Sequence, residues 1–227
     1  MRKGKRIFYR ELVYFVGIVV LAFSTALMER ADLGLSMVVA PAYLVHLKLV
    51  EYLPFFSFGM AEYVFQAVLL IALTLIMCKG KLSYLLSFAT AFFYGILLDG
   101  SIGIVGLLPV QGIWWRLALY GVGLFTCSVG VALLFHTYFP PEAYELFVKE
   151  LSQKTAMPIG KTKTIYDCIS CLLSVILSLV FFGKLVGVQW GTIVCALVNG
   201  WLIGRISRFL EAKFDFRDAL PLREKIG

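Results

Sequence analysis

Charged residues are scarce in this chain of 227 residues: Asp, Glu, Lys and Arg make up 15% and hydrophobic residues 60%. An ordinary globular protein is about a quarter charged and about half apolar. With a mean hydropathy of +0.88, the chain has too little polar surface to cover a water-soluble core. The composition therefore excludes a soluble enzyme, a disordered chain and a disulfide-rich secreted module. It predicts an integral membrane protein with one membrane domain.

Residues that carry catalysis or bind metals are also few. The two histidines, His46 and His136, fall near opposite membrane faces, and Cys168 and Cys171 lie in an apolar run, where cysteine acts as a small hydrophobic residue. The segment 159–162 resembles the end of a phosphate-binding loop but lacks the earlier glycine and the preceding strand of that motif. The sequence shows no pattern that would pair a catalytic nucleophile with a general base. We therefore expect no enzyme activity, no metal, no cofactor and no ATP-binding site.

Six continuous apolar runs approach or reach the length that a helix needs to cross a hydrocarbon core of about 30 Å. Strands of a membrane barrel would alternate in polarity instead. The sequence therefore predicts an all-α membrane protein with six transmembrane helices. Because five runs follow the first, we interpret the first as a retained helix rather than a cleaved signal peptide. The runs are Leu12–Met28, Met60–Cys78, Leu82–Leu98, Ile113–Phe135, Ile165–Phe182 and Val186–Ile203.

The positions of Lys and Arg predict the orientation of these helices. If the residues before the first run are cytoplasmic, all but four of the 21 Lys and Arg residues fall on the cytoplasmic side. The four outer residues are Arg30, Lys48, Arg116 and Lys184. Because cytoplasmic loops are enriched in Lys and Arg, both termini are expected in the cytoplasm. The net charge of +7 is then a topology signal, and we expect no nucleic-acid partner.

Two connections between the spans are too long and too patterned to be simple loops. They cover 31–56 and 138–162, and they begin with the turn-prone breaks Asp32–Gly34 and Pro140–Pro141. Helix-like stretches follow at 38–50 and 142–153. The second alternates apolar and charged residues at helical spacing and predicts an amphipathic surface helix. The first is more apolar and predicts a re-entrant segment.

The same order of elements occurs twice, which predicts an internal repeat. Tyr14–Gly17 aligns with Tyr120–Gly123, and Gln66 aligns with Asp167. Each half has three spans, so the second half starts from the opposite side of the membrane. We expect an inverted 3+3 repeat, with halves at 1–112 and 113–210 and a cytoplasmic tail at 211–227. Inverted repeats are typical of secondary transporters, whose sites lie at the midplane between the halves.

Three short motifs carry a resemblance to a known family. Ala31–Ser36, Trp190–Thr192 and Asn199–Gly200, in this order of elements, resemble the YitT/YczE-like family of bacterial integral membrane proteins over roughly residues 10–210. That family often has Pro and Trp-Asp after its Leu-Gly-Leu-Ser, where this chain has Met37–Val39. The resemblance implies a multi-pass protein of the bacterial cytoplasmic membrane and says little about its substrate.

Few polar residues lie within or beside the spans, so the candidate site is short. If the halves meet at a cavity, Gln66, Asp167 and Asn199 are its expected polar lining, because intramembrane polar groups usually face the protein interior. Asp32 and Ser36, at the first break, are further substrate-binding candidates.

Structural alternatives stay open for these residues. Asp167 is equally placed to pair with Lys163 on the same helix face, and Asn199 to form an interhelical hydrogen bond. We interpret Asp32, Glu62 and Asp99 as solvated loop charges.

The sequence therefore favours a transporter of a small solute or ion, driven by a gradient or by a separate ATPase. One alternative is a membrane-embedded solute-binding subunit that works with an energising partner. Another is a regulatory or scaffold membrane protein without transport. The lipid bilayer is the one partner that the composition requires, and a homo-oligomer is left open.

Overall fold

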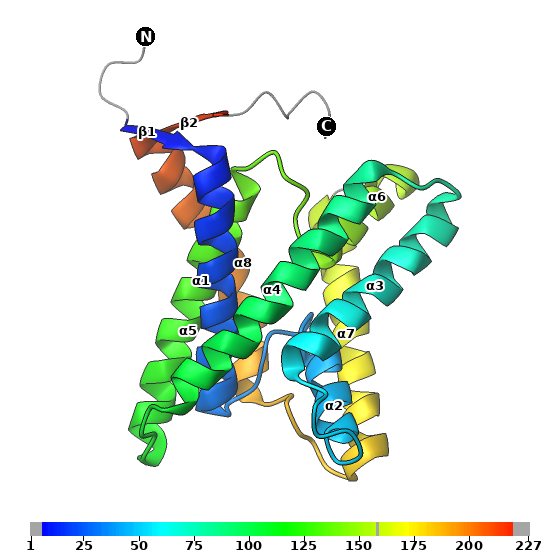
Figure 1. Cartoon of the computed structure of the whole chain (residues 1–227), viewed down its shortest axis with the longest axis vertical. Coiled ribbons are helices and arrows are strands. Elements are labelled where there is room, and N and C mark those ends of the chain that lie inside the picture. Colours follow the sequence, from blue (N-terminus) through cyan, green and yellow to red (C-terminus); the bar gives the residue numbers. More distant parts are fainter. Residues whose placement is uncertain (1–5, 158, 220–227) are drawn as a thin grey trace.

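The computed structural model describes residues 6–157 and 159–219. Within these residues, eight helices and two short strands follow one another along the chain (Figure 1). The elements are β1 (Arg6–Tyr9), α1 (Arg10–Ala31), α2 (Ala40–Leu49), α3 (Phe58–Met77), α4 (Leu82–Gly106), α5 (Gly112–Phe135), α6 (Ala143–Thr155), α7 (Ile159–Phe182), α8 (Trp190–Lys213) and β2 (Phe214–Arg217).

In the described residues, six helices are long and apolar enough to cross a membrane: α1, α3, α4, α5, α7 and α8. The prediction of six spans is confirmed, and the chain is a multi-pass integral membrane protein. The last span begins later than Val186 because Gly183 and Gly187, both with positive φ, turn the chain before Trp190. The same helix continues past Ile203 to Lys213, well beyond its apolar run.

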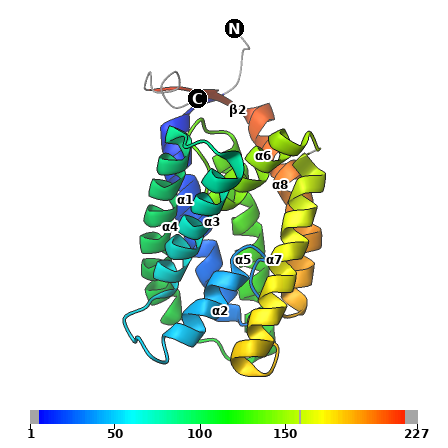
Figure 2. The ribbon, with the colours of Figure 1, turned by 90° about the vertical axis from the view of Figure 1, so that its right-hand side faces the viewer.

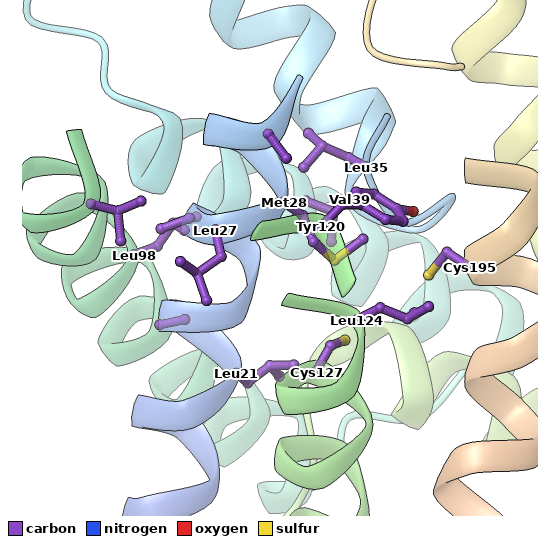
Figure 3. Close-up of a cluster of buried hydrophobic side chains, with 14 of the residues drawn as sticks. Leu21, Leu27, Met28, Leu35, Val39, Leu98, Tyr120, Leu124, Cys127 and Cys195 are labelled. Atoms are coloured by element: carbon purple, nitrogen blue, oxygen red, sulfur yellow. The ribbon is translucent and has the colours of Figure 1, made fainter. Parts of the chain in front are cut away.

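Helices α1 and α5 form the most extensively packed pair and lie on the left in Figure 1, with α4 packed on α1 and α8 packed on α5. Small residues allow α1 and α5 to approach closely, since a Cβ on Gly130 would lie 3.0 Å from the backbone nitrogen of Leu21. Their buried side chains meet those of α4 and α8 in one cluster, which includes Met28, Leu98 and Cys195 (Figure 3). Large apolar side chains on the outer faces, such as Leu75 and Val180, are exposed where lipid would contact them.

The short helices α2 and α6 lie toward opposite ends of the molecule, and each packs against both α3 and α7 (Figures 1 and 2). Helices were expected at both places, at 38–50 and 142–153. Helix α6 exposes Lys149, Gln153 and Lys154, but two carboxyl side chains, one directly before the helix and one within it, are covered. Glu142 and Glu150 are each 5% exposed, and Glu150 accepts hydrogen bonds from Lys81 Nζ at 2.6 and 2.7 Å.

Each break before a short helix is held by a long helix from the other part of the chain. After Asp32, the first break binds the start of α8: the Gly191 nitrogen donates to the Leu33 oxygen at 3.0 Å. Gly34 has a φ of +107°, and a Cβ there would lie 2.5 Å from Thr192 Oγ1. Only glycine fits this combination of conformation and close approach.

The second break, Pro140–Pro141, lies against α4. Ser87 Oγ donates to the Pro141 carbonyl at 2.7 Å, and Thr90 Oγ1 donates to the Pro140 carbonyl at 3.3 Å. Hydroxyl groups of α4 thus satisfy the carbonyl oxygens of this turn.

The two described ends of the chain meet at one end of the bundle, where β1 and β2 pair in parallel (Figure 1). Arg10 pairs with Asp218 at 2.5 Å, and the Ala219 nitrogen donates to the Glu11 carboxylate at 3.0 Å. The all-α prediction does not include this small sheet, because its two strands lie near opposite ends of the sequence and no local pattern pairs them. The basic residues Arg2, Lys3, Lys5, Arg223 and Lys225, used in the topology prediction, lie outside the described residues.

Candidate functional site

A cavity of about 1100 Å³ lies inside the bundle. Its walls come from α1, the first break, α4, α5, the second break, α6, Lys163 of α7, and α8. It extends from Ser36, at the first break, to Lys81, in the connection between α3 and α4. Its size is that of a small-molecule site, and its lining joins apolar side chains with a few polar groups.

Two of the sequence-predicted site residues line this cavity, Ser36 and Asn199. Asn199 Oδ1 accepts a hydrogen bond from Ser128 Oγ at 2.8 Å, so it also links α8 to α5. Ser36 lies in the first break, which is fixed next to it by the Leu35 nitrogen donating to the Gly187 oxygen at 3.1 Å. Both residues are therefore positioned at the cavity wall by bonds between distant parts of the chain.

The other three predicted residues do not line the cavity. Asp167 pairs with Lys163, one turn earlier on α7, at 3.0 Å, and it is Lys163 that reaches the cavity. Asp32 lies at the end of α1 and pairs with Arg116 at 2.6 Å. Gln66 is fully buried on α3, where its Oε1 accepts a hydrogen bond from the Ala143 nitrogen at 3.0 Å.

The interpretation of Glu62 and Asp99 as solvated loop charges is wrong. Asp99 belongs to α4, where it accepts hydrogen bonds from Ser57 Oγ at 2.5 Å and from the Gly59 nitrogen at 2.7 Å, and so holds the start of α3. Glu62 is 0% exposed within α3 because α6 packs over it. Its Oε2 accepts hydrogen bonds from Tyr144 Oη at 2.8 Å and from Gln66 Nε2 at 3.3 Å.

Glu142 is the residue that the site prediction missed. It precedes α6, lines the cavity, and is 5% exposed. Its Oε1 and Glu62 Oε1 are buried without a hydrogen-bond partner among the described residues. The available sequence signal was the glutamate directly after the Pro140–Pro141 break, together with the spacing of Glu62 and Gln66 on one helix face.

Burial raises the pKa of Glu142 well above its ordinary value, and the nearby carboxyls of Glu145 and Glu62 raise it further. A hydrogen bond from Gln66 opposes this rise. Burial also raises the pKa of Glu145, although the Lys163 ammonium opposes that change. The pKa of Tyr144 lies well above its ordinary value for the same primary reason, so its hydroxyl stays a donor to Glu62. The cavity wall thus contains a carboxyl group that favours its protonated form.

No group of three or more His, Cys, Asp or Glu side chains that could hold a metal ion occurs in residues 6–157 and 159–219. What the arrangement offers is a mostly apolar cavity with a few hydrogen-bonding side chains and one buried carboxyl, Glu142, on its wall.

One family model matches the chain, over residues 8–208, and its description is "Family of unknown function (DUF6198)". No curated protein and no solved structure matches the chain.

Proposed function

Because the chain belongs to the DUF6198 family, whose function is unknown, we propose from its geometry that it moves a small solute or ion across the membrane. The observation that carries this proposal is the cavity of about 1100 Å³ within a bundle of membrane-spanning helices. Polar groups inside a membrane protein are costly, and they mark substrate or ion pathways. Here Ser36, Glu142 and Asn199 supply such groups from three different segments.

We also propose that residues 1–112 and 113–210 are two inverted halves, which meet along α1 and α5. Reciprocal contacts between these helices support this. A Cβ on Gly17 would lie 3.0 Å from the Leu134 side chain, and a Cβ on Gly123 would lie 2.8 Å from the Met28 side chain. The same sequence offset relates 17 to 123 and 28 to 134, as expected for a twofold relation between the two helices.

The two breaks add a second reciprocal relation. The break at Gly34 lies against Thr192 of α8, and the break at Pro141 lies against Ser87 of α4. Each break is therefore held by the last helix of the other proposed half. Such an exchange ties the short helices of one half to the long helices of the other. Rocking of one half against the other would move both breaks together and open the cavity to alternate sides.

The location follows from the family resemblance and from the charges. The YitT/YczE-like motifs support a bacterial cytoplasmic membrane. The end of the bundle that carries β1 and β2 also carries Arg10, Arg208, Lys213 and Arg217. By the positive-inside rule this end faces the cytoplasm, with both termini on that side.

Neither alternative function gains support from an observation of its own. An energised binding subunit would favour an exposed cytoplasmic coupling helix, whereas α6 is packed against α3, α4 and α7. A scaffold without transport would favour a filled apolar interior, whereas the interior has a cavity with a few polar groups on its wall.

Labelling of a cysteine in the cavity tests the proposal without knowledge of the substrate. Gly200 lines the cavity, and an added Cβ there meets nothing within 4 Å. In inside-out and right-side-out membrane vesicles, a membrane-impermeant maleimide should label Gly200→Cys from both faces, above the level of the native cysteines. Gly121→Cys, at an equally open position on α5 outside the cavity, is the control and should stay at the native level. Labelling from one face alone would contradict alternating access.

A further inference from the structure

The two buried carboxyls, Glu62 and Glu142, come from different proposed halves and meet around one amide. Glu62 lies on α3 and Glu142 directly before α6. Gln66 Nε2 donates to Glu62 Oε2 at 3.3 Å, and the same amide lies near enough to Glu142 to lower the pKa of that carboxyl. The backbone nitrogen of Ala143, the first residue of α6, donates a hydrogen bond to Gln66 Oε1 at 3.0 Å. The carboxyls are thus held at a joint between the two halves.

Neither carboxyl is neutralised by a cation within the described residues. The ion pairs that the structure forms there include neither Glu62 nor Glu142. Two neighbouring buried carboxylates without a paired cation do not both stay charged, so the pair takes up one proton. Glu150 provides a contrast on the same cavity wall, because its carboxylate pairs with the Lys81 ammonium at 2.6 Å.

The surroundings of the two carboxyls are mostly acidic or neutral. Lys81, Lys149 and Lys163 line the same cavity, but Lys81 pairs with Glu150 and Lys163 with Asp167, and none of the three forms an ion pair with Glu142 in the described part of the chain. The titratable groups that face the pair or its immediate neighbours are Tyr14 on α1, Tyr94 on α4, Cys127 on α5, Tyr144 and Glu145 on α6, and Lys163, Tyr166 and Asp167 on α7.

The two carboxyls differ in access. Glu142 lines the cavity, whereas Glu62 lies behind it and does not. Glu142 also stands at the N-cap of α6, where the helix N-terminus favours a negative charge. Its deprotonated form is therefore attainable even though burial opposes it. Glu142 has a route by which a proton can leave, and Glu62 has none of its own.

We propose that Glu142 and Glu62 together form a proton-binding site, in which Glu142 exchanges one proton with the cavity and Glu62 increases the affinity for it. When the site empties, the O–H bond of the Glu142 carboxyl breaks, and the proton passes to water in the cavity and leaves a carboxylate. This proposal rests on the proposed transport function, and it names the proton as the coupling ion. Because its parts belong to different halves, movement between the halves would change its proton affinity.

Infrared difference spectroscopy of the purified full chain tests this site with the proton as the probe. The wild type should show the C=O band of a protonated carboxyl at neutral pH, and the band should disappear at alkaline pH. Glu142→Gln should abolish this titration. Glu62→Gln should keep it but lower its midpoint by about one pH unit, a tenfold lower proton affinity, because the second carboxyl no longer opposes the charge. Glu150→Gln, a matched cavity carboxyl that is already ion-paired, should leave the titration unchanged.

A wild-type measurement keeps the test decisive even if a variant fails to fold. On transfer to deuterated buffer, the band should shift promptly, because water in the cavity reaches Glu142. A band that does not shift, an absent band at neutral pH, or an unchanged titration in Glu142→Gln would overturn the proposal. The measurement needs no solute. A proton site without two-sided labelling of Gly200→Cys would therefore refute transport alone, and two-sided labelling without the band would refute the proton site alone.

Discussion

The Glu142→Gln variant should remove part of the pH dependence of stability. The raised pKa of Glu142 means that the folded protein holds a proton there that the unfolded chain has released. Stability from this group is complete below the ordinary glutamate pKa of about 4.3 and is lost as the pH rises toward the folded-state value. Glutamine keeps the size of the side chain and removes the titration. The wild type should therefore lose stability with rising pH more steeply than the variant.

The size of this difference in pH dependence follows from the number of protons involved, which is one. At most one proton differs between the two states at Glu142, so the slopes of wild type and variant should differ by up to about 1.4 kcal/mol per pH unit. For a chain of this length that corresponds to roughly 3–6 °C of melting temperature per pH unit. Thermal unfolding of the detergent-solubilised proteins from acidic to alkaline pH measures it, with Glu150→Gln as the ion-paired control. Parallel slopes in wild type and Glu142→Gln would refute the reasoning.

Two further substitutions test the break and the cavity. Gly34→Ala should destabilise the protein by about 1–3 kcal/mol in thermal unfolding, because a φ of +107° and the 2.5 Å approach to Thr192 both oppose a side chain. Gly100→Ala, which meets nothing within 4 Å in α4, should instead be neutral or stabilising by up to about 1 kcal/mol, and equal losses would contradict this account. Gly200→Trp should fill the cavity and prevent solute binding in a thermal-shift ligand screen, with stability changed by less than about 0.5 kcal/mol. Gly204→Trp, one turn further along α8 and outside the cavity, should bind solutes as the wild type does. If both tryptophan variants bind solutes equally well, the cavity is not the binding site.

The spans were predictable because a membrane requires each crossing helix to be a continuous apolar run. The ends of the helices were less predictable. Helix α4 continues through Asp99 and α8 through Arg205 and Arg208, since polar residues near a membrane surface do not end a helix. The two short helices could be predicted from their breaks, but the burial of Glu142 and Glu150 could not.

The candidate site was predicted in part. Ser36 and Asn199 line the cavity, whereas Asp167 is paired with Lys163, as the alternative interpretation allowed. Glu62 was misplaced because its burial depends on Tyr144, which is 82 positions away in the sequence. No local pattern reports which helix will cover a given face.

The sequence by itself determined that the chain is a membrane protein and how many spanning helices it has. It also determined that few polar groups are available for chemistry within the membrane. Those properties depend on composition and on runs of neighbouring residues, which the bilayer constrains directly. Only the tertiary structure decided which of those groups meet. Glu142, directly before α6, faces the cavity without a paired cation, while Glu150 within α6 is neutralised by Lys81, because such partners come from distant parts of the chain and packing selects them.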